Sequence, residues 1–429
     1  MAWPASPLEA APDHGGVTAR LAWTTVALLW SAYLLNYLDR QAVFSIFPVL
    51  RSELHFSDTQ LGLVGTLFIW VYSLCMPLTG RLADVFRRDR LVIASLVLWS
   101  LATLGTGLST SASAFLFWRV VMGVTESLYV PAALATIAAL HPGATRSKAL
   151  AIHSTAQFAG IIVGGWYGGW AADHIGWRRG FALVAMAGGA YALVLWRAFG
   201  GTPHFGNRLG TRHADQGAKP TDILKSACYW ALALAFFAFC TMLWMLYAWF
   251  PNFIYERYHL SMTESSVTAT VYIQISCMAG VLAGGVLADW LVQRIRYGRF
   301  LIAVVGLAGC APFGYLSLAA GSLATAKLSA TAFGFFAGVF VANTFAAAYD
   351  VISRQNYGLG TGLLNLVGGL AGGAAILATG LWKASLGMAV LMKWQAIASG
   401  AAAVLLLFVV VTRFASDRRL GTLVAETLL

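Results

Sequence analysis

The sequence predicts an all-α integral membrane protein with twelve transmembrane helices in two six-helix bundles, and three observations lead to this fold class. First, the chain of 429 residues is 59% hydrophobic and only 10% charged, whereas about 25% of residues are charged in soluble proteins. Second, apolar runs long enough for the ~20 residues of a bilayer crossing recur throughout. Third, 16 Trp and 44 Gly favour interfacial belts and close helix contacts over a β-barrel.

The apolar runs define the predicted spans and divide the chain. The spans are 21–46, 58–80, 91–110, 113–140, 147–172, 178–199, 223–252, 264–291, 298–320, 325–352, 357–382 and 387–414. The first run is longer than the apolar core of a signal peptide, so we expect it to be retained. We therefore expect a cytoplasmic tail over 1–20, one bundle over 21–199, a cytoplasmic linker over 200–222, a second bundle over 223–414 and a cytoplasmic tail over 415–429.

The basic residues indicate topology. If both termini are cytoplasmic, the inner loops and ends hold 19 of the 28 Lys and Arg, which is the positive-inside bias. We expect a multi-pass protein of the cell membrane with the lipid bilayer around it and no nucleic-acid partner, despite the net charge of +11. The five cysteines are scattered singly without metal-binding or disulfide spacing, so we expect no metal and no other cofactor.

The two halves of the chain repeat a series of short motifs. Phe47-Pro48, His55-Phe56-Ser57 and Gly80-Arg81-Leu82-Ala83-Asp84 recur about 204 residues later. The second copies are Phe250-Pro251, His259-Leu260-Ser261 and Gly285-Val286-Leu287-Ala288-Asp289. A repeat of six plus six spans is typical of transporters, because two bundles that rock about one another expose a midplane site to either side.

The segment Gly80 to Asp84, with Arg87, Arg88 and Arg90 after it, resembles the loop 2–3 motif of the major facilitator superfamily, and Gly285 to Asp289 resembles its loop 8–9 copy. Arg87 replaces the usual second Gly, and Asp89 interrupts the basic run. The resemblance implies a gating motif, in which the glycines permit close helix approach and the carboxylates change partners. The alternative is a solvated loop that only sets orientation. The motif residues are Gly80, Asp84, Arg88, Gly285 and Asp289.

Ionisable residues deep in two spans indicate a functional site, because each is costly in hydrocarbon. Asp39 and Arg40 lie in the first span, while Arg119 and Glu126 share one face of the fourth. An arginine fork can bind a carboxylate through two hydrogen bonds. Burial favours a protonated carboxylate and a nearby guanidinium favours the ionised form, so substrate binding can change proton occupancy. The alternative is a permanent ion pair, either Asp39–Arg119 or Arg40–Glu126.

The series Asn36 to Arg40, the pattern Arg119, Gly123 and Glu126, and Gln157 in the fifth span resemble the anion:cation symporter branch of the superfamily. That branch includes sialin-like and bacterial sugar-acid carriers, and spinster-like lipid carriers share much of the pattern. The resemblance implies that Arg40 holds a substrate carboxylate, Asp39 and Glu126 carry the proton, and Gln157 contacts hydroxyls. The candidate substrate-binding residues are Arg40, Tyr37, Arg119, Gln157, Tyr247 and Asn365.

Several other polar and aromatic residues could have either a structural or a functional role. The aromatic outer half of span seven around Trp244 and Trp249 is typical of a lipid-facing belt, although Tyr247 in it is also a candidate substrate contact. His153 fits packing better than proton relay, and Lys393 can reach the outer face. Asp350 with Arg354 fits a local pair. Asn343 and Asn365 suit either interhelical hydrogen bonding or substrate contact.

These patterns predict a secondary active transporter that carries a small organic anion with protons by alternating access, as a monomer. A spinster-like lysolipid or drug carrier is the alternative. Outside the transporters, the remaining interpretation of the sequence is a non-transporting membrane receptor or an integral membrane enzyme. The sequence shows no convincing nucleophile, metal cluster or His–carboxylate group near a span end, so we expect no enzyme. The glycine runs of spans five and eleven match no phosphate-binding motif and favour helix packing.

Overall fold

The computed structural model describes residues 19–141, 145–199, 221–353 and 356–426, which are helical apart from short connections and contain no strand. The first half consists of α1 (Ala19–Ser45), α2 (Phe47–Glu53), α3 (Asp58–Val85), α4 (Arg88–Gly107), α5 (Ala112–Ser127), α6 (Tyr129–Leu140), α7 (Arg146–His174) and α8 (Trp177–Phe199). The second half consists of α9 (Thr221–Lys225), α10 (Ala227–Tyr258), α11 (Met262–Val292), α12 (Gly298–Ala319), α13 (Leu323–Tyr349), α14 (Tyr357–Leu386) and α15 (Met388–Glu426). Most of the predicted linker and of the first tail lies outside the described residues.

Each predicted span is helical, although the span 113–140 is divided between α5 and α6. Eleven helical segments of the described chain are long and apolar enough to cross a membrane. α7 is not among them, because Gly, Trp and Tyr lower the mean hydropathy of its middle. It nevertheless packs between α1 and α11 inside the molecule. The first repeated motif was predicted to follow a span that ends at residue 80, but residues 80–84 continue α3, whereas 285–289 lie within α11 as the predicted span 264–291 implies. Leu, Ala and Arg are strong helix formers, so the helices extend beyond their apolar cores.

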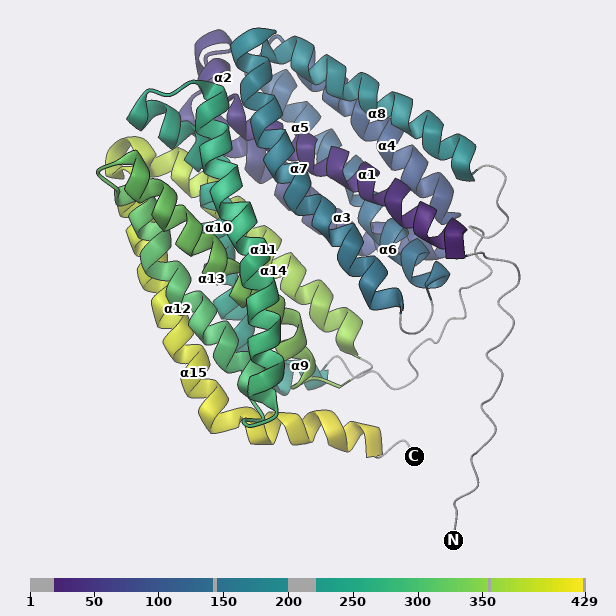
Figure 1. Cartoon of the computed structure of the whole chain (residues 1–429), viewed down its shortest axis with the longest axis vertical. Coiled ribbons are helices and arrows are strands. Elements are labelled where there is room, and N and C mark those ends of the chain that lie inside the picture. The colour runs from purple at the N-terminus through teal and green to yellow at the C-terminus, as the bar shows by residue number, and fades with distance from the viewer. Residues whose placement is uncertain (1–18, 142–144, 200–220, 354–355, 427–429) are drawn as a thin grey trace.

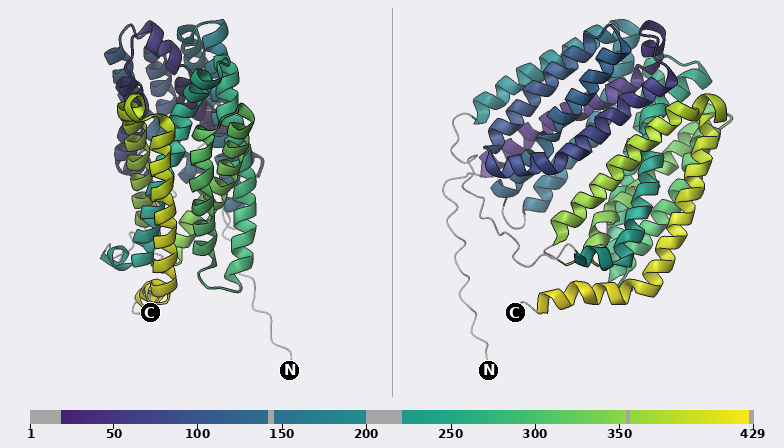
Figure 2. Two further views of the ribbon diagram at one scale, coloured as in Figure 1. Left: turned by 90° about the vertical axis from the view of Figure 1, so that its left-hand side faces the viewer. Right: turned by 180° about the vertical axis from the view of Figure 1, so that it is seen from behind.

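The helices form two bundles, α1 to α8 and α10 to α15, which meet at one end and diverge toward the other (Figures 1 and 2). α1 begins and α15 ends at the divergent end (Figure 1), which we call the inner end because the sequence predicts it to face the cytoplasm. A Cβ placed at Gly62 of α3 would touch α14 near the opposite, outer end, whereas one at Gly80 or at Gly362 would meet nothing within 4 Å. α3 and α14 therefore separate toward the inner end.

Small residues bring the helices around the centre close together. A Cβ at Gly164 or Gly168 of α7 would lie 2.5 Å from a backbone oxygen of α1, at Leu38 and Ala42 respectively. On α14, a Cβ at Gly368 would lie 2.6 Å from the ring of Phe236 in α10. The predicted packing role of both glycine runs is confirmed, because a larger residue would force these helices apart.

The internal repeat is visible in local geometry at the outer end of both halves. His55 and His259 adopt φ of 51° and 55°, a left-handed conformation that is uncommon for residues other than glycine. Two residues later, Ser57 begins α3 and Ser261 begins α11, and each forms a capping box with the residue three positions on. The repeated His-x-Ser motif therefore specifies the same turn between a helix end and a capped helix start.

Candidate functional site

An ion pair between α1 and α5 forms the centre of the site. Arg40 Nε donates to Glu126 Oε2 at 2.5 Å, and Glu126 is fully buried while Arg40 is 8% exposed. The guanidinium carbon lies 4.8 Å from the ring centroid of Tyr37 and 4.4 Å from that of Tyr72. Of the two ion pairs that the sequence allowed between the first and fourth spans, the structure therefore contains Arg40–Glu126. Aromatic faces complement the guanidinium charge, so the arginine is held without saturating its donors.

A helix break positions Glu126. The predicted span 113–140 is divided at Leu128 between α5 and α6. Pro131 lies in the first turn of α6, where its ring would clash with the Ser127 carbonyl of a continuous α-helix. Glu126 therefore occupies the last turn of α5, directly before this interruption of the helix.

Asp39 and Arg119 lie beside this pair. The Thr103 hydroxyl of α4 donates to Asp39 Oδ2. Arg119 is completely buried; its Nε donates to the Val64 carbonyl at 3.1 Å and its Nη1 to Met122 Sδ at 2.9 Å. Asp39 is close enough to interact electrostatically with both Arg119 and Glu126. The structure thus brings all four predicted ionisable groups together, with two positive and two negative formal charges.

Each of these four side chains keeps unused hydrogen-bonding capacity. Among the described residues, one buried polar atom of each has no hydrogen-bond partner: Asp39 Oδ1, Arg40 Nη2, Arg119 Nη2 and Glu126 Oε1. Buried polar atoms are almost always paired in proteins, and an unpaired one requires an explanation. The cluster therefore has the donors and acceptors to accept a further polar group or a proton.

The other candidate substrate contacts divide into two groups. Tyr247 of α10 is half-buried and close enough to Tyr37 to interact electrostatically, and its carbonyl accepts a hydrogen bond of 3.3 Å from Gln41 of α1. Gln157 is half-buried one turn before Gly160, where a Cβ would touch Tyr37. Asn365, in contrast, is exposed on α14 and donates to the Thr361 carbonyl of its own helix at 3.0 Å. The structure thus brings Tyr247 to Tyr37 and places Gln157 one turn from the contact between Gly160 and Tyr37, whereas the side chain of Asn365 bonds within its own helix.

The predicted lipid-facing belt in the outer half of α10 is wrong. Trp249 and Phe250 are completely buried, and the Trp249 indole donates to the Ile376 carbonyl of α14 at 3.1 Å. Trp244 lies against α14 at Gly372. Aromatic side chains suit both a membrane interface and a protein interior, so composition could not distinguish the two surroundings.

The remaining polar candidates have local partners. Asn343 donates to the Gly284 carbonyl of α11 at 3.1 Å, as an interhelical bond. Buried His153 lies 3.2 Å from the Tyr129 hydroxyl, as expected for packing, and Lys393 is exposed near the start of α15. Asp350 binds Arg299 at 2.8 Å, whereas its expected partner Arg354 lies outside the described residues. Burial raises the pKa of the Asp350 carboxyl, and the Arg299 guanidinium opposes that rise.

The residues of the gating motif do not connect the bundles in this conformation. Asp84 and Asp289 are exposed, and neither forms an ion pair within the described chain. A Cβ at Gly285 would meet nothing within 4 Å, as at Gly80. Arg88 donates to the Ala135 carbonyl of α6 at 3.3 Å, and so stays within the first bundle. Close helix approach at these glycines is absent here, because the inner ends are apart.

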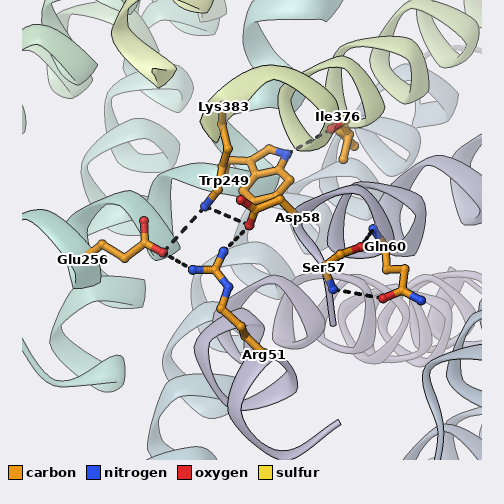
Figure 3. A network of polar contacts seen from close by, with 8 residues as sticks. All are labelled: Arg51, Ser57, Asp58, Gln60, Trp249, Glu256, Ile376 and Lys383. Carbon is orange, nitrogen blue, oxygen red and sulfur yellow. Dashed lines mark hydrogen bonds and ion pairs between the residues drawn. The ribbon is translucent and has the colours of Figure 1, made fainter. Parts of the chain in front are cut away.

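The outer end holds a charged network that the sequence did not reveal (Figure 3). Arg51 of α2 binds Asp58 of α3, and its Nη1 also lies 2.8 Å from Glu256 of α10. Lys383 of α14 lies 3.3 Å from Asp58 and 3.6 Å from Glu256, with its ammonium 4.9 Å from the Trp249 ring. Two cations and two carboxylates from both bundles therefore connect the outer ends of four helices.

The chain matches one family model and is similar in sequence to several known proteins. The family model described as Major Facilitator Superfamily matches residues 29–376. A probable sulfoacetate transporter of Cupriavidus necator is 27% identical, covering 66% of this chain and 69% of its own. The hexuronate transporter of Bacillus subtilis is 24% identical, and the match covers 81% of this chain and 84% of that transporter. Human protein spinster homolog 1 is 29% identical, and the match covers 68% of this chain and 60% of the human protein.

Among solved structures, the fold is similar to that of a bacterial homolog of the human lysosomal transporter Spinster. The inward-facing, unoccupied structure of that protein matches with a TM-score of 0.76, at 18% identity, and covers 95% of this chain and 99% of its own. At this level of identity the likeness shows the fold alone. Together, the family match and the shared fold account for the two-bundle architecture.

Proposed function

Since the chain belongs to the Major Facilitator Superfamily, we propose that it is a transporter that carries a small organic anion together with protons by alternating access. The observation that carries this proposal is the buried Arg40–Glu126 pair at 2.5 Å, with Asp39 and Arg119 beside it. The names of the relatives, which include transporters of hexuronate and sulfoacetate, support the anion as substrate class.

The proposed binding step is an exchange of partners on Arg40. Glu126 occupies Nε in this structure and leaves Nη2 unpaired. A substrate carboxylate that binds the guanidinium fork gains two charge-assisted hydrogen bonds, and it weakens the hold of Arg40 on Glu126. Glu126 then favours the protonated form, because a buried carboxylate without a cation is costly.

Charge balance supports coupling to at least one proton. Two arginines and two carboxylates sum to zero in the empty cluster when all four are ionised. An anion that enters alone adds an uncompensated negative charge in a low-dielectric site, which is expensive even after relaxation. One proton taken up by Asp39 or Glu126 restores neutrality and allows the loaded bundles to reorient.

Alternating access would proceed between this conformation and its opposite. The outer ends are joined through Arg51, Asp58, Glu256 and Lys383, while the inner ends of α3 and α14 are apart. In the opposite conformation we expect the outer contacts to break and the gating motif around Gly80 and Asp84 to meet the second bundle. We propose that both termini are cytoplasmic and that one chain suffices for transport.

A lysolipid or drug carrier is the second candidate, because the chain also resembles the human protein spinster homolog 1 and shares the fold of the bacterial homolog. An anionic headgroup would bind Arg40 through the same fork. The hydrocarbon part of such a substrate, however, requires an apolar path that a sugar acid does not need.

Uptake by purified protein in proteoliposomes distinguishes the candidates. The panel consists of labelled sugar acids, monocarboxylates and aromatic acids, and a lysophospholipid, each with and without an inward proton gradient. We expect an acid to accumulate only with the gradient. Transport of the lysolipid alone would favour the second candidate, and transport of none of these compounds would contradict the proposal.

A further inference from the structure

We infer that Gln274 of α11 contacts hydroxyl groups of the substrate and so sets specificity from the second bundle. This inference rests on the proposed function. It assigns a residue of the second bundle, whereas the ionisable cluster and Gln157 belong to the first bundle.

Gln274 is a buried amide whose polar neighbour is Tyr247, which lies close to it but outside good hydrogen-bonding geometry. The residue is completely shielded, and neither its amide nitrogen nor its amide oxygen has a partner in hydrogen-bonding geometry among the described residues. Loss of hydration by a polar amide costs free energy unless new hydrogen bonds replace it. Leucine has a similar size and would occupy the same position in α11 without that cost.

The position of Gln274 connects it to the site. The Tyr247 side chain of α10 lies within hydrogen-bonding reach of the Gln274 amide and also interacts electrostatically with Tyr37. The Tyr37 ring lies against the Arg40 guanidinium. One turn earlier on α11, Thr270 would touch a Cβ placed at Gly165 of α7, so this face of the helix is directed toward the first bundle. Tyr37 and Tyr247 therefore link Arg40 in one bundle to the unpaired amide in the other.

The chemistry of an amide fits a polyhydroxy acid. An amide offers two donors and one acceptor group, so it can both donate to and accept from a hydroxyl. When Arg40 holds the carboxylate, the hydroxyls at the far end of the molecule extend toward the second bundle. A ligand that binds both residues bridges the two bundles, whereas an acid without hydroxyls binds only the arginine and leaves the amide unpaired.

The test is Gln274→Leu, with Gln293→Leu as the matched control, because Gln293 ends the same helix and is exposed. Inhibition constants of D-gluconate, D-glycerate and propionate are measured against uptake of a labelled acid that the parent protein carries. We expect Gln274→Leu to weaken inhibition by gluconate roughly 3- to 10-fold, the range of one or two neutral hydrogen bonds, and to leave inhibition by propionate unchanged. The control should change neither.

Thermal unfolding in detergent excludes a purely structural role. Because neither amide atom has a partner in good hydrogen-bonding geometry, Gln274→Leu should keep or raise the unfolding temperature. An equal loss for gluconate and propionate, or no loss for either, would overturn the inference and leave the proposed function intact. A lowered unfolding temperature without a change in inhibition would also overturn it. If the parent carries no acid, the proposed function fails and this inference fails with it.

Discussion

Arg40 and Glu126 form a buried ion pair joined by one hydrogen bond, from the guanidinium Nε to the carboxylate Oε2 at 2.5 Å. Among the described residues, no group meets Nη2 of the same guanidinium or Oε1 of the same carboxylate in good hydrogen-bonding geometry, although the side chains of Tyr72 and Asn36 lie close to the pair. A permanent structural pair would be expected to use both arms of the fork, because bidentate geometry is the stronger arrangement. The unused arms favour an exchangeable pair.

Replacement of Arg40 by lysine tests the fork directly. Arg40→Lys keeps the charge but loses the planar pair of donors, so we expect substrate affinity to fall roughly 10- to 100-fold, the range of a hydrogen bond to a charged group. Binding is measured by isothermal titration or by inhibition of uptake. Arg257→Lys, at an exposed site on α10, is the control. Equal affinity in both variants would remove Arg40 from carboxylate binding.

Replacement of Glu126 by glutamine tests proton coupling. Glu126→Gln resembles a permanently protonated carboxyl, so the variant should lose accumulation driven by a proton gradient and keep counterflow exchange of substrate. Both are measured with labelled substrate in proteoliposomes. Full accumulation in Glu126→Gln would assign coupling elsewhere, and the same pair of assays on Asp39→Asn would then show whether that carboxylate carries the proton.

The outer network predicts a conformational effect at a distance from the substrate. Lys383→Met removes one cation that contacts both Asp58 and Glu256. Ion pairs near a protein surface contribute about 0.2–1 kcal/mol each, so we expect the population with an open outer end to rise roughly 2- to 10-fold. Spin labels at Ser52 and Arg257, in a chain with its cysteines replaced, report the separation of the outer ends. Lys393→Met is the control, and an unchanged distance distribution in Lys383→Met would contradict a gating role.

Asn343, in contrast, is expected to stabilise the fold without contacting the substrate. Its amide donates to the Gly284 carbonyl of a neighbouring helix, so Asn343→Leu should lower the free energy of unfolding by about 1 kcal/mol while substrate affinity stays at the parental value. Thermal unfolding and binding measured on the same preparation separate the two effects. A selective loss of affinity with unchanged stability would place Asn343 in the substrate path.

The sequence predicted the features that depend on local composition or on rare residues. Apolar length determined the helices, and the cost of buried charge identified Asp39, Arg40, Arg119 and Glu126 before their proximity was known. It could not choose between Arg40–Glu126 and Asp39–Arg119 as the direct pair, because a rotation of the first helix by about 100°, the angle between neighbouring residues, decides that geometry. The pairing is therefore a structural result.

The charged network at the outer end could not be predicted for a different reason. Arg51, Asp58, Glu256 and Lys383 lie at helix ends, where charged residues are ordinary, and up to about 330 residues separate them. Only the packing of the two bundles brings them together. Gln274 was missed similarly, because an uncharged amide in an apolar helix gives a weak signal until its lack of a partner is visible.

The most direct test of the account is the reversal potential of substrate current in proteoliposomes, with pH and membrane voltage varied separately. We predict that substrate flux depends on the proton gradient with at least one proton per carboxylate. For a monocarboxylate the transport is electroneutral at one proton and carries positive charge inward at two. Flux that follows a sodium gradient and is indifferent to pH would contradict proton coupling through Glu126 and Asp39.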